Sequence, residues 1–257
     1  MNEEEHLHFL IDYLQKEAND FFPYETLSFS EKFELFRGLC NVREPIEVSD
    51  NFLLSQDKLL THIKDNRSLT TIDQLDELSS GQYVWQGDIT TLKVDAIVNA
   101  ANSKLLGCLQ RNHNCIDNII HTYAGVQLRL ACHQIIQNQG RKEPVGKAKI
   151  TKAYHLPSTY VIHTVGPYID KKGVTPLKES LLASSYRSSL ELADNYNLSS
   201  IAFCCISTGV FNFPQEKAAQ IAIDTINKYK RETQSNIKII YNVFTDKDLH
   251  IYKALLD

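Results

Sequence analysis

Three side chains in one short stretch of the chain have the types and the spacing to bind a metal ion. Cys108, His113 and Cys115 are arranged as C-x4-H-x-C, and thiolates and imidazoles are the ligands that zinc prefers. No second Cys/His pair of that kind lies nearby in the sequence, so the fourth position would stay open for water or substrate, as in catalytic zinc sites. By itself, the spacing is equally compatible with two buried cysteines and a hydrogen-bonded histidine.

Asn102 is a second candidate, because it closely follows a short apolar segment. Residues 96–100 (AIVNA) are typical of a strand that is buried on both faces. Ligands of α/β sheets bind beyond the carboxyl ends of such strands, where the Asn102 amide could offer a donor and an acceptor to a sugar hydroxyl. The alternative is a turn residue that satisfies its own backbone.

The elements that must position these residues alternate between strand and helix from Tyr83 onward. Alternation of this kind predicts a sheet with helices on both faces. We expect strands near residues 83–86, 95–100, 148–154, 160–165, 200–206 and 237–243, and helices near residues 116–138, 177–196, 215–230 and 246–255.

Residues 1 to about 80 are expected to be helical. Ser28 and Glu31 have the spacing of a capping box, and the apolar faces are expected to pack on one another or on the α/β domain, with partner binding as the alternative. Apolar side chains recur at helical spacing in three runs, from Leu7 to Leu14, from Phe33 to Leu39 and from Leu53 to Ile63.

The overall composition gives no reason to expect nucleic acid or membrane partners. The chain has 27 Lys and Arg against 31 Asp and Glu, a net charge of −4, so it has no bulk attraction to nucleic acid or to an anionic membrane. It starts with an acidic segment and has no apolar run long enough to span a bilayer. We therefore expect a cytoplasmic protein, in which Cys40, Cys132, Cys204 and Cys205 are buried thiols.

Five segments resemble the macrodomain, an ADP-ribose-binding fold, in order and spacing from about Gln82 to the C-terminus. The resemblance implies a three-layer α/β/α macrodomain with a mixed central sheet over residues 81–257, preceded by a helical N-terminal extension over residues 1–80. The five segments are residues 87–90 (GDIT), 99–102 (NAAN), 117–125 (DNIIHTYAG), 161–167 (VIHTVGP) and 207–214 (STGVFNFP).

The segment before the predicted helix at 116–138 departs from the common family pattern. Most macrodomains have a glycine-rich turn there, whereas this chain has GCLQRNHNC over residues 107–115. Both this segment and the long N-terminal extension resemble the zinc-containing branch of microbial macrodomains, in which a Cys, a His and a second Cys hold zinc beside the distal ribose. The resemblance therefore implies Zn²⁺ as the cofactor, with Cys108, His113 and Cys115 as its ligands.

The resemblance also implies two contacts to adenine. Asp88 resembles the aspartate that accepts a hydrogen bond from the adenine amino group, with Ile89 beside it, and a carboxylate favours an exocyclic amine over a carbonyl. The alternative for Asp88 is a turn-capping residue. Phe244 would lie against the base, since an aromatic face suits stacking; the alternative is a core aromatic at a strand end.

A loop before the predicted helix at 215–230 is a candidate diphosphate site. Successive backbone N–H groups and a helix N-terminus can bind a pyrophosphate without net positive charge, and glycine allows close approach. Phe211 would close over the distal ribose, and Asn212 stands where the family often has glycine. The candidate residues are Ser207, Thr208, Gly209, Val210 and Phe211.

Asp117 stands where hydrolytic macrodomains have an aspartate at the start of this helix. The resemblance thus implies a zinc-dependent hydrolase that removes mono-ADP-ribose from protein side chains, with Asn102 positioning the ribose and Asp117 assisting water. It further suggests an ester to Asp or Glu and a carrier protein of lipoate metabolism as substrate. His121 and His163 are expected to be hydrogen-bonded structural residues.

Two other classes of function remain open from the sequence. One is a reader module that binds ADP-ribose without cleaving it, although such a module needs neither Asp117 nor a metal. The other is a zinc-stabilised interaction protein, in which the metal holds a loop and the N-terminal helices bind a partner.

Overall fold

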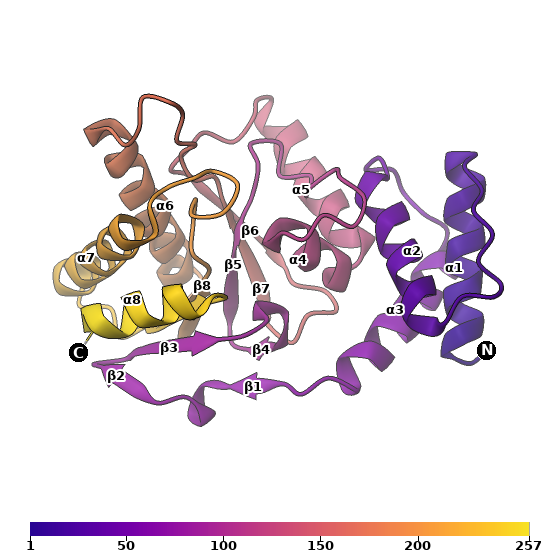
Figure 1. Ribbon diagram of the computed structural model, residues 1–257, viewed down its shortest axis with the longest axis horizontal. Helices are drawn as coiled ribbons and strands as arrows, with labels where there is room; N and C mark the ends of the chain where they lie inside the picture. Colours follow the sequence, from indigo (N-terminus) through magenta and orange to yellow (C-terminus); the bar gives the residue numbers. More distant parts are fainter. Residues whose placement is uncertain (257) are drawn as a thin grey trace.

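A seven-stranded mixed sheet forms the centre of the computed structural model, which describes residues 1–256 (Figure 1). Its strand order is β2-β3-β9-β8-β5-β7-β6, in which β2 and β6 are antiparallel to their neighbours and the other pairs are parallel. The strands are β2 (Glu77–Ser79), β3 (Gln82–Gln86), β5 (Ala96–Ala100), β6 (Ala148–Lys152), β7 (Tyr160–Thr164), β8 (Ser200–Phe203) and β9 (Lys238–Val243).

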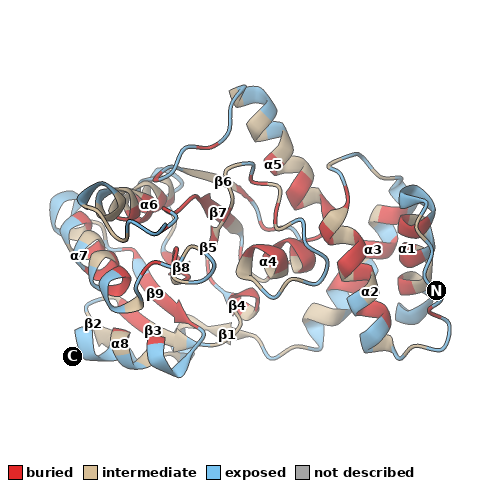
Figure 2. Cartoon of the chain, turned by 45° about the horizontal axis from the view of Figure 1, so that its top comes forward, coloured by how far each residue is buried: buried red, intermediate tan, exposed pale blue. Residues whose placement is uncertain are grey.

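Helices cover both faces of this sheet, which gives the predicted three-layer architecture. Helices α4 (Ile116–Ala124) and α5 (Val126–Gln139) pack on one face. Helices α6 (Pro176–Asn195), α7 (Gln215–Thr233) and α8 (Asp246–Leu256) lie together on the other. The buried residues follow the strands and the helix sides that face them (Figure 2), so the main core lies on both sides of the sheet.

One predicted helix is in fact two. The sequence predicted a single helix over residues 116–138, but Gly125 has a φ of +92° and an extended ψ of 172°, which breaks the helical path. The Val126 N–H that the break exposes donates to Gln56 Oε1 at 2.9 Å. Because Gln56 belongs to the N-terminal extension, the local sequence could not reveal this cap.

The N-terminal extension forms a three-helix bundle with its own core. Its helices are α1 (Glu3–Ala18), α2 (Phe29–Val42) and α3 (Asp50–Asp65), and the predicted capping box of Ser28 and Glu31 is present. The predicted apolar faces pack on one another and on Tyr123 and Val126 of the α/β layers. The bundle is therefore joined to the sheet domain by apolar packing at α4 and α5.

Short strands between the bundle and the sheet were missed by the sequence. The helices end at Asp65, and the following segment forms β1 (Thr70–Thr71), which pairs with β4 (Leu92–Lys93), and then β2, which pairs with β3. Strands of two or three residues have too few side chains to show a period of two.

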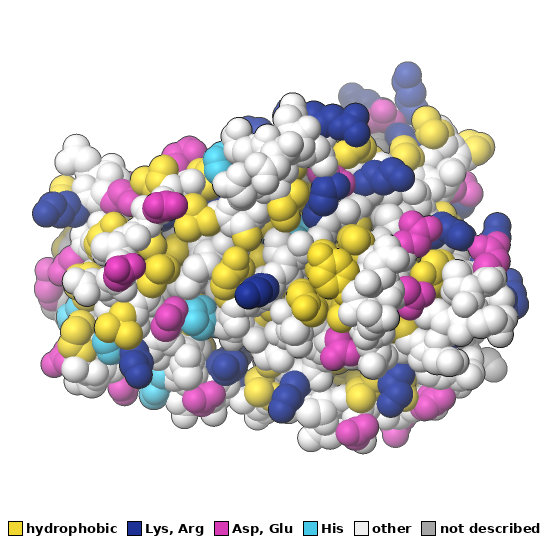
Figure 3. Space-filling view, turned by 180° about the vertical axis from the view of Figure 1, so that it is seen from behind, with side chains coloured by type: hydrophobic (Ala, Val, Ile, Leu, Met, Phe, Trp, Pro, Cys, Tyr) yellow, Lys and Arg dark blue, Asp and Glu magenta, His cyan; other side chains and the backbone are white. Residues whose placement is uncertain are grey.

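The surface and the cysteines agree only in part with the sequence expectations. All six cysteines are free; Cys132 and Cys204 are buried as predicted, whereas Cys40 and Cys205 are only partly buried. Acidic and basic side chains are interspersed on the face drawn in Figure 3. No helix within residues 1–256 is long and apolar enough to cross a membrane.

Candidate functional site

A large cleft opens at the carboxyl ends of four neighbouring parallel strands, β3, β9, β8 and β5, where α/β sheets bind their ligands. Its volume is about 1100 Å³, which is ample for a dinucleotide-sized ligand. Every residue for which the sequence predicted a role in the site lines this one cleft: Asp88, Ile89, Asn102, Cys108, His113, Cys115, Asp117, Ser207, Thr208, Gly209, Val210, Phe211 and Phe244.

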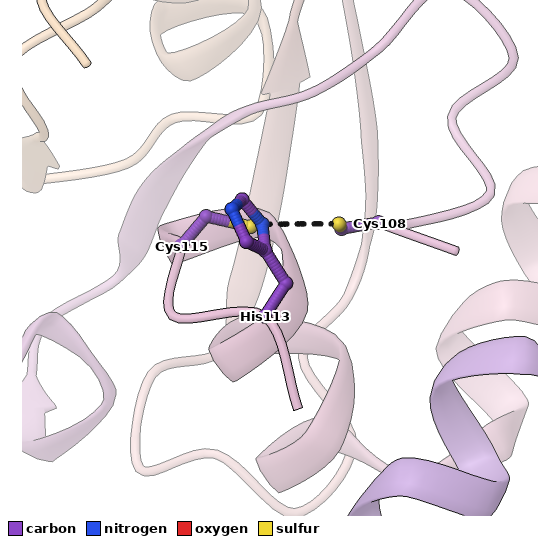
Figure 4. A group of neighbouring side chains, drawn as sticks. All are labelled: Cys108, His113 and Cys115. Carbon is purple, nitrogen blue, oxygen red and sulfur yellow. Dashed lines mark hydrogen bonds between the residues drawn. The ribbon is translucent and has the colours of Figure 1, made fainter. Parts of the chain in front are cut away.

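The three candidate metal ligands point toward one another (Figure 4). They belong to residues 108–115, which we call the metal loop. Their ligand atoms all lie within 4.8 Å of one another, and Cys108 Sγ lies 3.3 Å from His113 Nδ1. Two atoms bound to one zinc at the usual bond lengths lie roughly 3.6 Å apart. The donor types and their spacing therefore fit a zinc ion after small side-chain movements.

This group of donors is open on the side of the cleft. Among residues 1–256 it has only three members, Cys108, His113 and Cys115, and all three line the cleft. Burial raises the pKa of the Cys115 thiol to about 12, and a bound cation would favour its thiolate form. A zinc ion held here would keep one position for a group from the cleft.

Asp117 lies two residues after the metal loop, at the start of α4, and is only 6% exposed. Its Oδ1 accepts a hydrogen bond from Asn99 Nδ2 at 2.8 Å, and its Oδ2 accepts one from Asn102 Nδ2 at 3.3 Å. Burial raises the pKa of Asp117 to about 6, although both amides and the charge of Arg129 oppose the shift. This carboxyl group is thus fixed in position and is basic enough to accept a proton near neutral pH.

Both polar groups of the Asn102 side chain form hydrogen bonds within the protein. Its Nδ2 also donates to the carbonyl of Gly107 at 2.8 Å, and its Oδ1 accepts from the N–H of Lys104 at 2.9 Å. The residue therefore closes the turn after β5, the alternative that the sequence left open, and orients Asp117. Its carbonyl oxygen keeps a second lone pair for a sugar hydroxyl.

Two buried histidines beneath this end of the cleft differ in their contacts. His163 has hydrogen-bond partners on both ring nitrogens, Thr151 Oγ1 at 3.0 Å and Asn99 Nδ2 at 3.3 Å, as predicted. His121 forms no hydrogen bond through either ring nitrogen within the described chain, although its Nε2 lies 3.6 Å from Asp117 Oδ1, so the prediction of a hydrogen-bonded residue was wrong for it. Burial lowers the pKa of both residues, which keeps both rings neutral.

The candidate diphosphate loop lines the cleft and has backbone N–H groups without a protein acceptor. Its ends are closed by two backbone hydrogen bonds of 2.9 Å, from Phe213 to Ser207 and from Asn212 to Gly209. In the described chain, the N–H groups of Gly209, Val210 and Phe211 donate to no protein group. A Cβ on Gly209 would meet nothing within 4 Å, so this backbone is open to a ligand.

The cleft has few basic side chains that could bind an anion. Among the described lining residues, Lys104 is the only lysine or arginine, whereas three aspartates, Asp88, Asp117 and Asp248, also line the cleft. A diphosphate would therefore depend on N–H groups rather than on basic side chains, as the sequence predicted.

Asp88 and Phe244 follow β3 and β9, which β8 separates from β5 and the metal loop that comes after it. Asp88 caps the short 3-10 helix Ile89–Thr91, since its Oδ1 accepts from the Thr90 N–H at 2.9 Å. Phe244 is 74% exposed, so the alternative of a core aromatic is excluded. An exposed ring beside a carboxylate suits a nucleobase with an exocyclic amine.

Comparisons with known proteins identify the family to which this fold belongs. A family model described as "Macro domain" matches residues 98–222. A Staphylococcus aureus protein named protein-ADP-ribose hydrolase is 54% identical over 252 residues, which cover 96% of this chain and 93% of the relative. This chain belongs to the macrodomain family.

Solved macrodomain structures resemble the present one. An Oceanobacillus iheyensis macrodomain, a mutant solved with ADPR, is 38% identical and has a TM-score of 0.64 over 71% of this chain and 96% of its own. A Trypanosoma brucei macrodomain in complex with ADP-ribose is 27% identical and has a TM-score of 0.66, over 86% and 95% of the two chains.

Two features of this macrodomain were not accessible from the sequence. Arg67, just after α3, forms an ion pair with Asp88 Oδ2 at 2.5 Å and lies over the ring of Tyr123, so the N-terminal extension holds the aspartate for which the sequence predicted a contact to adenine. Asn212 has a φ of +56°, a conformation that asparagine tolerates better than most residues. This explains how asparagine can stand where the family often has glycine.

Proposed function

We propose that this macrodomain is a zinc-dependent hydrolase that removes mono-ADP-ribose from modified protein side chains and releases ADP-ribose. The observation that carries the proposal is the position of three candidate zinc ligands and one buried carboxylate at the same end of the nucleotide-sized cleft. The 54%-identical relative that is named a protein-ADP-ribose hydrolase supports the reaction class.

The arrangement of the cleft suggests one orientation for ADP-ribose. Adenine would lie between Asp88 and Phe244, and the diphosphate would accept hydrogen bonds from the free N–H groups of the loop at Gly209. The distal ribose then reaches Asn102 and the metal loop, where its anomeric carbon would face Asp117. The modified side chain of the substrate leaves the cleft on this side.

Asp117 would act on the water that cleaves the bond. It accepts a proton from water as the oxygen attacks the anomeric carbon, the bond to the modified side chain breaks, and the proton passes to the released side chain. Asn99 and Asn102 keep the carboxylate in place during this transfer. Zinc held by Cys108, His113 and Cys115 would supply Lewis-acid stabilisation to a ribose hydroxyl or to water.

The finer substrate assignment comes from the resemblance to the zinc-containing branch. We infer an ester to Asp or Glu as the cleaved bond and a lipoate-carrier protein as a modified substrate. Incubation of zinc-loaded protein with defined Asp/Glu-linked, Ser-linked and Arg-linked conjugates, with free ADP-ribose as the readout, tests this assignment. Release from the Ser-linked or Arg-linked conjugate alone would contradict the ester.

The conjugate assay, together with metal removal and cleft substitutions, separates the hydrolase from its two rivals. A reader module would bind ADP-ribose and release none from any conjugate. A zinc-stabilised interaction protein would lose its fold on metal removal, while substitutions in the cleft would leave its partner binding unchanged. The buried, hydrogen-bonded Asp117 favours the hydrolase, because neither rival needs a fixed carboxylate beside the metal loop.

A further inference from the structure

Helix α2 of the N-terminal extension contacts the metal loop directly. The loop itself contains little regular structure, and its backbone bonds are short-range, from His113 to Gln110 at 3.3 Å and from Cys115 to His113 at 3.0 Å. Such turns do not fix a loop of eight residues by themselves. The position of its ligands must therefore depend on contacts with other parts of the chain.

Arg37 makes the most direct of these contacts. Its Nη2 donates to the main-chain carbonyl of His113 at 2.9 Å, and its Nε donates to Asn118 Oδ1 at 3.1 Å. Asn118 in turn donates to the carbonyl of Gln110 at 3.1 Å. The Arg37 side chain is only 14% exposed, so one partly buried guanidinium joins the metal loop to the first turn of α4, which carries Asp117.

Asn112 forms a second attachment at the tip of the loop. Its N–H donates to Asn41 Oδ1 at 3.0 Å, and its Nδ2 donates to the carbonyl and to Oε2 of Glu34 at 2.7 and 2.8 Å. The Asn112 side chain lies on Gly38, where an added Cβ would collide with its Oδ1. Glu34 and Gly38 of α2 thus contact the Asn112 side chain, and Asn41 of the same helix binds the Asn112 backbone N–H.

We propose that α2 holds the metal loop in its metal-binding conformation, with Arg37 as the positioning residue. The extension then sets how tightly the loop retains its ion, because partners behind a metal ligand fix the orientation of that ligand. The part of this inference that concerns zinc rests on the proposed function. The part that concerns the loop conformation stands on the contacts alone.

Zinc transfer to a chromogenic chelator is the direct test. Arg37→Ala should release zinc roughly tenfold or more faster than the wild type, and Arg37→Lys should recover only part of the loss, because an ammonium lacks the planar fork that reaches both acceptors. Lys32→Gln is the matched control: Lys32 is a buried cation on the same helix, 4% exposed, but it pairs with Glu4 of α1 at 2.7 Å. It should release zinc at the wild-type rate.

Gly38→Ala separates loop positioning from general loss of stability. Alanine raises the helix propensity of α2. If α2 only stabilised the fold, this variant would therefore be at least as stable as the wild type and would bind the metal equally well. If α2 positions the loop, this variant should release zinc faster, because the new methyl group displaces the Asn112 side chain. Zinc release within twofold of wild type for both Gly38→Ala and Arg37→Ala would overturn the proposal.

Amide hydrogen exchange of the metal-free protein tests the effect of α2 on the loop conformation without zinc. Exchange at residues 109–115 should be faster in Arg37→Ala and Gly38→Ala than in the wild type and Lys32→Gln. If wild-type protein bound no zinc, the metal in the proposed function would fail, and exchange would still decide the role of α2. Unchanged exchange in both variants would contradict that role.

Discussion

Two loops that line the cleft are built in different ways. The loop over residues 207–213 closes on itself through backbone hydrogen bonds and leaves three N–H groups free for a ligand. The metal loop is instead attached by side chains of α2, more than seventy residues earlier in the sequence. The first loop offers backbone dipoles and suits binding, whereas the second offers candidate metal ligands next to Asp117 and suits chemistry. Substitutions at the two loops should therefore affect different quantities.

The largest effect is expected at the metal-loop end, for Asp117→Asn. Loss of the proton acceptor should lower kcat by roughly 10²- to 10⁴-fold, while the affinity for ADP-ribose stays within a few-fold of wild type. Steady-state kinetics on an ester-linked conjugate, with calorimetric titration of ADP-ribose, measures both quantities. Equal losses in turnover and affinity would show that binding and chemistry are not divided between the two loops.

An intermediate effect is expected at the candidate diphosphate loop, for Gly209→Val. The wild-type residue has open space around its Cβ position, so the folded state should tolerate valine, but the side chain would block the approach of a diphosphate to the free N–H groups. A hydrogen bond to a charged group contributes about 1.5–3 kcal/mol, so affinity for ADP-ribose should fall roughly tenfold to hundredfold. The melting temperature and the zinc content should not change. Unaltered affinity would place the diphosphate elsewhere.

The smallest effect is expected for Phe244→Ala at the adenine end. Stacking of a base on an aromatic ring contributes about 1–3 kcal/mol, and a ring that is 74% exposed should lie at the lower end of that range. Affinity should fall roughly fivefold, with Phe244→Trp near wild type. Calorimetry with ADP-ribose against ribose 5-phosphate provides the control, since only the ligand with a base should respond.

The difference between the two loops also explains what the sequence could predict. The cleft residues lie in continuous segments such as NAAN at 99–102 and STGVFNFP at 207–214, so family resemblance located them. Short-range patterns likewise predicted the order of strands and helices. All of the predicted site residues then line one cleft, because the carboxyl ends of parallel strands meet at one edge of the sheet.

The contacts that the sequence missed are all long-range. Arg37, Arg67 and Gln56 lie on helices of the extension or just after them, and their partners are more than twenty residues away. Their local sequences resemble those of ordinary solvated helix residues. The break at Gly125 was missed for a related reason, since the apolar pattern continues on both sides of it.

The most direct test of the account is a joint measurement of metal content and turnover for wild type and Cys115→Ala. We expect about one zinc per chain in the wild type. In the variant we expect loss of that zinc together with a loss of turnover larger than the 10- to 100-fold typical of residues behind a metal ligand, while ADP-ribose still binds. A metal-free variant that cleaves the ester-linked conjugate at the wild-type rate would contradict the account.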